Sequence, residues 1–331
     1  MTSSIKFLAV VFLLPLAAIA QKKEPWVNLP KEQWPRMALT NHVQFKNGDR
    51  YIDPSFTYAA TGFLIDTGND TLAATAKHVL WVAKNKKSRA VQINSELQQW
   101  TMTPKGNDAD MVVIDSLLNE DSTEILEGGA SSILERDMIV FSVKQVSKNV
   151  FPLKPRYRAV IPGEKLYILS CDYANPTCKI YEGTVFKKLG MEILIDRKMK
   201  EHLGGSSGSA VIDSNGYLVG VISSATSYGK EGKPVSVAIS TEYLYDVLNK
   251  KPGLNTPKKD YGSLILQTTT EKGAAAAIQQ YKDLISDPKN YYEYNLFAAN
   301  RNGLREAGEK LLALNRLEDA VALYGDRKSV V

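Results

Sequence analysis

From about Val43 to Val247 the sequence is a series of short β-rich runs separated by turn residues. The runs include "DMVVI", "MIVFSV", "KLYILS", "MEILI", "SAVI" and "YLVGVIS". Many short strands with frequent turns between them are typical of all-β barrels and sandwiches. Roughly 210 residues of this pattern are too many for one small barrel and suit two packed barrels. The sequence therefore predicts an all-β fold with a double β-barrel.

The composition is that of a globular protein without a strong charge bias. The chain has 331 residues, of which 44% are hydrophobic and 23% charged, and its formal net charge is +5. It can therefore bury a core and remain soluble. Lys and Arg are scattered rather than gathered into a basic face, so we expect no nucleic-acid partner.

The N-terminus has the layout of a secretory signal peptide. Lys6 precedes an unbroken apolar run, Phe7 to Ala18, and Ala18-Ile19-Ala20 supplies small residues before Gln21. We expect residues 1–20 to be removed and the mature protein to be exported to a bacterial periplasm or beyond the cell, with no membrane span left. The alternative is that this run stays as an N-terminal membrane anchor.

After Pro252 the β-rich runs give way to a linker and then to a helical pattern. Residues 253–262 read as a linker, and from Ala274 to Ile285 apolar residues recur at helical spacing. The stretch "LREAGEKLLALNRLEDAVALY" gives two further amphipathic helices that resemble a tetratricopeptide pair. We expect a small helical tail over residues 263–325 that can bind a protein partner. Helical patterning stops at Tyr324, so we expect the natural tail to continue further.

The two cysteines, Cys171 and Cys178, lie in "CDYANPTC". Export permits a disulfide between them, and a pair of free thiols is the alternative. The three histidines form no metal-ligand pattern, so we expect neither a metal nor another cofactor.

Three stretches carry the residues of nucleophilic catalysis. "TLAATAKHVL" places His78 after an apolar run, "NDADMVVID" places Asp110 before one, and "GGSSGS" surrounds Ser207 with glycine and serine. A serine hydroxyl is a weak nucleophile until an imidazole can take its proton, and the imidazole needs a carboxylate that orients it. The glycines permit the tight turn in which backbone N–H groups converge on a developing oxyanion.

These blocks, taken in order, resemble those of the chymotrypsin-like serine proteases. "TAKHVL", "ADMVVI" and "GSSGSAV" are similar to the family's His, Asp and Ser blocks. "GYLVGVISS" and "VSVAIST" are similar to its following strands, particularly in bacterial trypsin-like proteases of the high-temperature-requirement kind. The resemblance implies a trypsin-like protease domain, which we place at residues 21–252. No PDZ-like segment is evident in the sequence after Val247, where the predicted helical tail lies.

The resemblance also assigns roles to individual residues. It implies Ser207 as nucleophile, His78 as general base and acid, and Asp110 as the orienting carboxylate, for which Asp108 is the alternative. The backbone N–H groups of Gly205 and Ser207 would form the oxyanion hole. Ser223 would lie close to the carboxylate, and Ser224 and Ala225 would line the peptide-binding edge.

The function implied is that of a secreted serine endopeptidase that cleaves peptide or protein substrates through an acyl-enzyme. The alternative is an inactive protease-like scaffold that binds exported proteins through its cleft and its helical tail.

Overall fold

The computed structural model describes most of the chain beyond the N-terminal segment. The described residues are 22–46, 57–82, 93, 97–119, 126–127, 130–131, 136–197, 204–228, 232–250, 259–287, 289–294, 296 and 303–330. The predicted signal peptide lies outside them.

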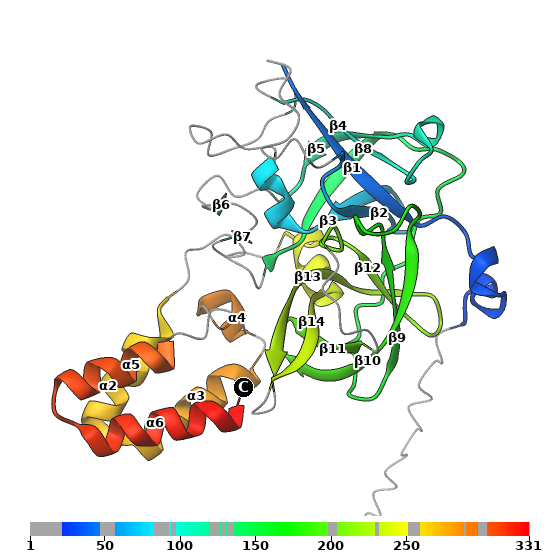
Figure 1. The fold of residues 1–331 in the computed structure, drawn as a ribbon. Coiled ribbons are helices and arrows are strands. Elements are labelled where there is room, and N and C mark those ends of the chain that lie inside the picture. Colours follow the sequence, from blue (N-terminus) through cyan, green and yellow to red (C-terminus); the bar gives the residue numbers. More distant parts are fainter. Residues whose placement is uncertain are drawn as a thin grey trace, which may run out of the picture.

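The first half of the chain forms a closed antiparallel barrel (Figure 1). Its strands are β1 (Ala38–Phe45), β2 (Thr61–Asp66), β3 (Thr71–Thr75), β4 (Leu97–Thr103), β5 (Val112–Leu117) and β8 (Ile139–Gln145). Their order around the barrel is β1-β2-β3-β8-β5-β4. Two short strands, β6 (Leu126–Glu127) and β7 (Ala130–Ser131), pair with each other before β8.

Residues 165–240 form another closed barrel, packed against the first. Its strands are β9 (Lys165–Ser170), β10 (Lys179–Leu189), β11 (Glu192–Arg197), β12 (Ala210–Asp213), β13 (Leu218–Tyr228) and β14 (Lys233–Ser240). They follow the order β10-β11-β14-β13-β12-β9. The double β-barrel predicted from the spacing of strands and turns is therefore confirmed.

Strand β2 shows how the alternation of side chains builds two cores at once. Leu64 points into the first barrel, where it packs with Trp100 and Phe141. Its neighbours Phe63 and Ile65 belong instead to a cluster that contains residues of both barrels. Successive side chains of a strand face opposite sides of the sheet, so one apolar strand can fill a barrel and also bury the interface between barrels.

The segment that links the barrels carries a buried arginine. Arg156 lies between β8 and β9, and its backbone N–H donates to the carbonyl of Leu218. Its guanidinium contacts the carboxylate of Asp213 at 2.7 Å and that of Glu164 at 2.5 Å. The Asp213 side chain is completely buried and that of Arg156 is only 4% exposed. This ion pair therefore fixes the linking segment against β12.

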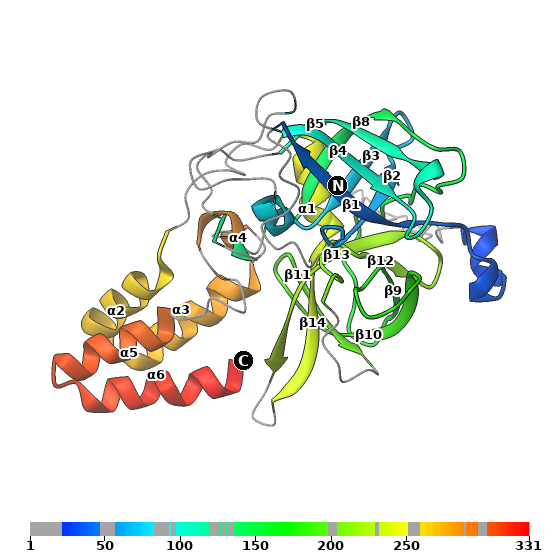
Figure 2. The same cartoon turned by 45° about the horizontal axis from the view of Figure 1, so that its top comes forward.

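Helix α1 (Thr241–Leu248) directly follows β14, and five more helices follow it in the described part of the chain. They are α2 (Tyr261–Lys272), α3 (Ala274–Ser286), α4 (Asn290–Glu293), α5 (Gly303–Ala313) and α6 (Leu317–Val330). Figure 2 shows them beside the barrels. The expected linker, 253–262, overlaps the first turn of α2, because Asp260 caps this helix. Helix α6 also continues past Tyr324, where the apolar pattern ends. None of the helices in the described part of the chain is long and apolar enough to span a membrane.

We expect Arg156→Ala to lower the free energy of unfolding by about 3–5 kcal/mol, because it leaves the carboxylate of Asp213 buried without its partner. Lys233→Ala is the control, since Lys233 pairs with Asp196 at the surface. We expect it to cost less than about 1 kcal/mol. Urea unfolding followed by fluorescence measures both changes. Equal losses in the two variants would contradict a structural role for the buried pair.

Candidate active site

His78 lies just after β3, in the 3₁₀ helix Lys77–Val82, and is buried. Its Nδ1 is 2.6 Å from Asp137 Oδ2, and its backbone N–H donates to Asp137 Oδ1 at 2.7 Å. On the other side of the ring, Nε2 is 2.9 Å from Ser207 Oγ. The Asp137 carboxylate accepts a hydrogen bond from Nδ1–H, so neutral His78 presents an unprotonated Nε2 to the serine hydroxyl.

The carboxylate comes from Asp137 because of the register between β3 and β8. These strands are antiparallel, with Thr75 opposite Ile139. Continuing this register two residues further brings Asp137 beside the residues that follow β3. Asp137 is completely buried, and the Ser223 hydroxyl donates a second side-chain hydrogen bond to Oδ2. Burial of an ionised carboxylate requires such partners.

The structure does not place Asp110 at the histidine. Asp110 precedes β5, which pairs with the far end of β8, with Val113 opposite Gln145. There its carboxylate accepts hydrogen bonds from Ser147 and Asn149. Asp110 and Asp137 thus lie at opposite ends of β8, which is about 20 Å long at 3.3 Å per residue. The prediction that Asp110 orients His78 is corrected to Asp137.

Asp110 also contacts Asn107 and Arg36. Its Oδ2 accepts from Asn107 and lies 3.2 Å from the guanidinium of Arg36. Hydrogen bonds from Asn149 and Ser147 are the main reasons why the pKa of Asp110 lies below its usual value. Its alternative, Asp108, accepts from the Thr103 hydroxyl. Both residues therefore belong to the turn between β4 and β5.

Burial and charge act in opposite directions on the pair of His78 and Asp137. Burial lowers the pKa of His78, but the adjacent charge and hydrogen bond of Asp137 raise it above its usual value. Burial raises the pKa of Asp137, while His78 and the Ser223 hydrogen bond bring it below its usual value. The carboxylate is therefore ionised at neutral pH, and it favours a proton on the imidazole.

The segment around Ser207 is held by the first barrel although it belongs to the second. The backbone N–H of Thr61 donates to the carbonyl of Ser207 at 2.9 Å, and its hydroxyl donates to the carbonyl of Gly205 at 2.9 Å. Gly208 has a φ of +78° and lies so close to Thr61 that a Cβ there would be 2.1 Å from the Thr61 carbonyl oxygen. Only glycine fits such a position.

The backbone N–H groups of Gly205 and Ser207 meet no acceptor within the described residues. Gly205 has a φ of +88°, a left-handed conformation that glycine adopts without strain. The neighbouring Ser206 is turned away from His78, because its side chain is buried and accepts a hydrogen bond from Ser170 at 3.1 Å. Ser207 is therefore the serine whose hydroxyl faces the imidazole.

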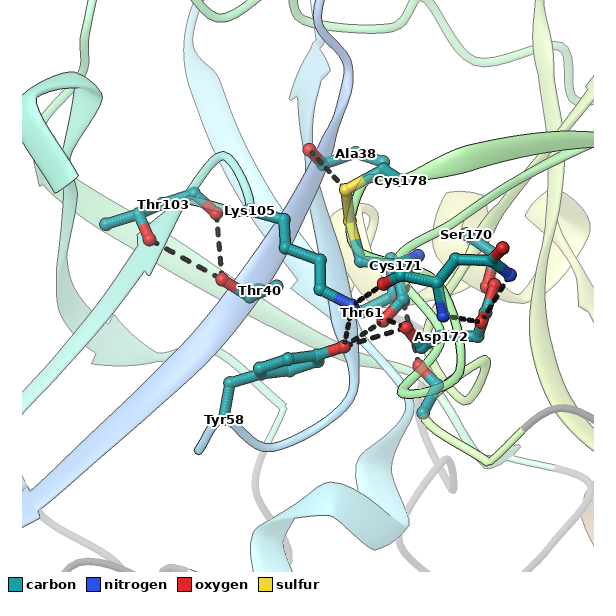
Figure 3. The surroundings of a disulfide bond; sticks show 12 residues. Ala38, Thr40, Tyr58, Thr61, Thr103, Lys105, Ser170, Cys171, Asp172 and Cys178 are labelled. Carbon is teal, nitrogen blue, oxygen red and sulfur yellow. Dashed lines mark hydrogen bonds between the residues drawn. A yellow bond between two sulfur atoms is a disulfide. The ribbon is translucent and has the colours of Figure 1, made fainter. Parts of the chain in front are cut away.

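The other residues expected at the site lie on β13 and in the loop between β9 and β10. Ser224 and Ala225 follow Ser223 and pair with Val237 and Ser236 of β14. Cys171 and Cys178 are joined by a disulfide, which closes the loop between β9 and β10 (Figure 3). Among the described residues, no group of three or more His, Cys, Asp or Glu side chains is placed to hold a metal ion.

Comparison with protein families gives one match. A family model described as the trypsin-like peptidase domain matches residues 60–221. This stretch contains His78, Asp137 and Ser207. Residues 60–221 form a trypsin-like peptidase domain. The match begins just before β2 and ends within β13, so it covers most strands of both barrels.

Solved structures of serine proteases are similar to this chain. A serine endoprotease from Yersinia pestis is 16% identical, with a TM-score of 0.41, over 64% of this chain and 61% of that one. The active form of the Rv3671c protease from M. tuberculosis is 13% identical, with a TM-score of 0.42, over 76% and 95%. The HtrA-type protease AlgW with a decapeptide is 14% identical, with a TM-score of 0.41, over 72% and 65%. The chain thus spans less than two thirds of the length of the first and third of these proteins. Comparison with curated protein sequences finds no match.

Sequence reasoning missed Asp137 although the signal was present. "RDMIVFSV" places an acidic residue before a hydrophobic run, as "ADMVVI" does for Asp110. Both residues also satisfy the order His, Asp, Ser. Strand pairing distinguishes the two aspartates. The strand after Asp137, β8, pairs with β3, which leads to His78, whereas the strand after Asp110, β5, does not.

We expect Asp137→Asn to lower the pKa of His78, because it removes the charge that raises this pKa and leaves the burial that lowers it. Asp110→Asn is the matched control and should leave the pKa of His78 unchanged. NMR titration of the histidine ring protons, assigned with His78→Gln, measures the effect. A shift in the Asp110 variant alone would reverse the assignment.

An alanine in the left-handed conformation costs about 1–2 kcal/mol. We expect Gly208→Ala to destabilise the protein by more than this, because the added Cβ collides with Thr61 and Thr75. Gly163 is the control, since its φ is +86° and a Cβ there meets nothing within 4 Å. Urea unfolding of both alanine variants gives the two free energies. Equal destabilisation would show that the collision has no effect.

Proposed function

We propose that this protein is a serine endopeptidase that hydrolyses peptide bonds through an acyl-enzyme. The observation that carries the proposal is the single line of contacts from Asp137 through His78 to Ser207. It supports the proposal because it supplies a nucleophile, a base and an orienting carboxylate inside a trypsin-like peptidase domain.

In the first half of the reaction the Ser207 oxygen attacks the carbonyl carbon of the peptide bond while His78 Nε2 takes the hydroxyl proton. Asp137 stabilises the imidazolium through the hydrogen bond at Nδ1. The carbonyl oxygen becomes an oxyanion, which the backbone N–H groups of Gly205 and Ser207 would bind. When the tetrahedral intermediate collapses, the C–N bond breaks and His78 passes its proton to the leaving amine.

In the second half of the reaction water takes the place of the amine. His78 Nε2 accepts a proton from the water, whose oxygen attacks the ester carbon of acylated Ser207. Collapse breaks the ester bond, and the proton returns to the Ser207 oxygen. The product carboxylic acid then leaves. Because the base must be neutral, the raised pKa of His78 predicts that activity falls toward acidic pH at a higher pH than for an isolated histidine.

Strand β13 supplies an edge for an extended substrate. Its pairing with β12 covers Leu218 to Val221, whereas its pairing with β14 continues to Tyr228. In the described structure, the part of β13 from Ser224 onward is therefore paired on one side alone. A peptide that adds to such an edge gains backbone hydrogen bonds, which fits Ser224 and Ala225 as substrate-binding residues.

Export is the second part of the proposal. The disulfide between Cys171 and Cys178 is typical of oxidising compartments, which agrees with a removable signal peptide at residues 1–20. Among the described residues, the helical tail contributes nothing to the hydrogen bonds of His78, so we assign it to a protein partner rather than to chemistry. Its tetratricopeptide-like character remains part of this proposal.

The test uses purified residues 21–331 and an unfolded protein such as casein. New peptide N-termini, counted by mass spectrometry, report cleavage. We expect Ser207→Ala to reduce the rate by about 10⁶-fold, as loss of a serine nucleophile does in other enzymes. Ser206→Ala is the control and should stay within about tenfold of the wild type, because its hydroxyl faces Ser170. Cleavage that survives Ser207→Ala refutes the proposed function.

A further inference from the structure

The disulfide-closed loop between β9 and β10, residues 171–178, lies against the glycine segment that precedes Ser207. The backbone N–H of Tyr173 donates to the carbonyl of Gly204 at 2.8 Å. A Cβ at Gly205 would lie 3.0 Å from both the backbone nitrogen and the ring of Tyr173. The 171–178 loop therefore determines where Gly204 and Gly205 lie.

A lysine of the first barrel holds this loop. Lys105 lies in the turn after β4, and Figure 3 shows its side chain reaching the loop. Its ammonium donates to Tyr58 Oη at 2.7 Å, to the carbonyl of Asp172 at 2.6 Å and to the carbonyl of Asn175 at 2.5 Å. A lysine ammonium has three N–H groups, so these three acceptors use all of them.

Tyr58 contacts both Lys105 and the 171–178 loop. Its hydroxyl accepts from Lys105 and donates to the carbonyls of Cys171 and Asp172, at 2.8 and 2.9 Å. The Lys105 ammonium also lies 4.9 Å from the centre of the Tyr58 ring, within the range of a cation–π contact. Without Lys105, the carbonyls of Asp172 and Asn175 lose a charged donor that no neutral side chain of similar shape replaces.

We propose that Lys105 is a positioning residue for the reaction at Ser207: it ties the 171–178 loop to the first barrel and so holds the N–H of Gly205 toward the substrate carbonyl. The proposal rests on the proposed function. The hydrogen bonds of Lys105 go to Tyr58, Asp172 and Asn175, and not to His78 or Ser207. Its effect passes through Asp172 and Tyr173 to Gly204, whose carbonyl is bonded to the N–H of Tyr173.

The protonation of Lys105 gives a readout that simple destabilisation does not. Burial lowers the pKa of Lys105 below its usual value, against the opposing charge of Asp172. Burial raises the pKa of Tyr58, so its phenol stays neutral while Lys105 loses its proton. A neutral amine keeps two N–H groups for three acceptors. An open cavity of about 540 Å³, lined in part by Tyr58, Lys105 and Tyr173, gives the proton a path to solvent.

The titratable and charged groups around Lys105 come from several elements. They are Asp108 after β4, His42 on β1 against Tyr58, Asp172 and Tyr173 in the 171–178 loop, and Tyr181 of β10, whose hydroxyl donates to Asp172. Burial raises the pKa of Tyr181. The tyrosines with raised pKa values therefore do not titrate before Lys105 does.

The test measures kcat and KM on a peptide substrate across the pH range 6 to 11. It compares the wild-type residues 21–331 with three variants of the same residues. We expect Lys105→Met to lower kcat by about 10- to 100-fold with little change in KM, since displacing an oxyanion donor affects the transition state alone. Lys105→Arg retains charge and donors and does not deprotonate. It should restore kcat to within about threefold and keep activity at alkaline pH, where the wild type declines. Lys233→Met is the control and should match the wild type.

If the wild type is active and Lys105→Met matches it in kcat and in alkaline decline, the positioning role is refuted while the proposed function stands. If the wild type itself cleaves nothing, both are refuted. If Lys105→Met does not fold, as judged by circular dichroism, the wild type and Lys105→Arg decide: identical alkaline declines refute the proposal, and a decline in the wild type alone supports it.

Discussion

The placement of Ser207 beside His78 depends on contacts that Thr61 makes between the two barrels. This residue begins β2 of the first barrel, yet both its N–H and its hydroxyl bond to carbonyls of the segment around Ser207. Its hydroxyl also accepts from the backbone N–H of Cys171. His78 and Asp137 belong to the first barrel and Ser207 to the second, so a small change in packing between barrels would separate Ser207 from His78. The Thr61 contacts fix that distance.

The buried charge is the second constraint. An ionised Asp137 without exposure to water would be very unfavourable alone. It is satisfied from three directions, by the His78 ring, by the His78 backbone and by Ser223 of the second barrel. The same contacts hold the imidazole in one orientation. Interactions that stabilise the folded chain thus also prepare the proton transfer.

Much of the fold and two of the three central residues follow from the sequence. The barrels could be predicted because short apolar runs with turns are local signals. His78 and Ser207 stand in distinctive local contexts, "TAKHVL" and "GGSSGS". Asp137 could not be chosen locally, because Asp110 has the same kind of neighbours. Which of them reaches His78 depends on strand pairing across 60 residues or so, and only barrel closure settles that.

The contacts of Lys105 and Tyr58 with the loop between β9 and β10 were likewise out of reach of the sequence. They join side chains to backbone carbonyls, which leave no mark on residue identity. For the helical tail the sequence predicted the helices, but not where the first of them begins. Its amphipathic pattern predicted helices, while its first helix, α2, begins within the expected linker because a single side chain, Asp260, caps it.

The most direct test of the central claim is fluorophosphonate labelling of residues 21–331, with the adduct located by peptide mass spectrometry. We expect one adduct, on Ser207, with labelling lost in His78→Ala and strongly slowed in Asp137→Asn. A folded protein that takes no adduct, or takes it on another serine, would contradict the role of Ser207 as the nucleophile.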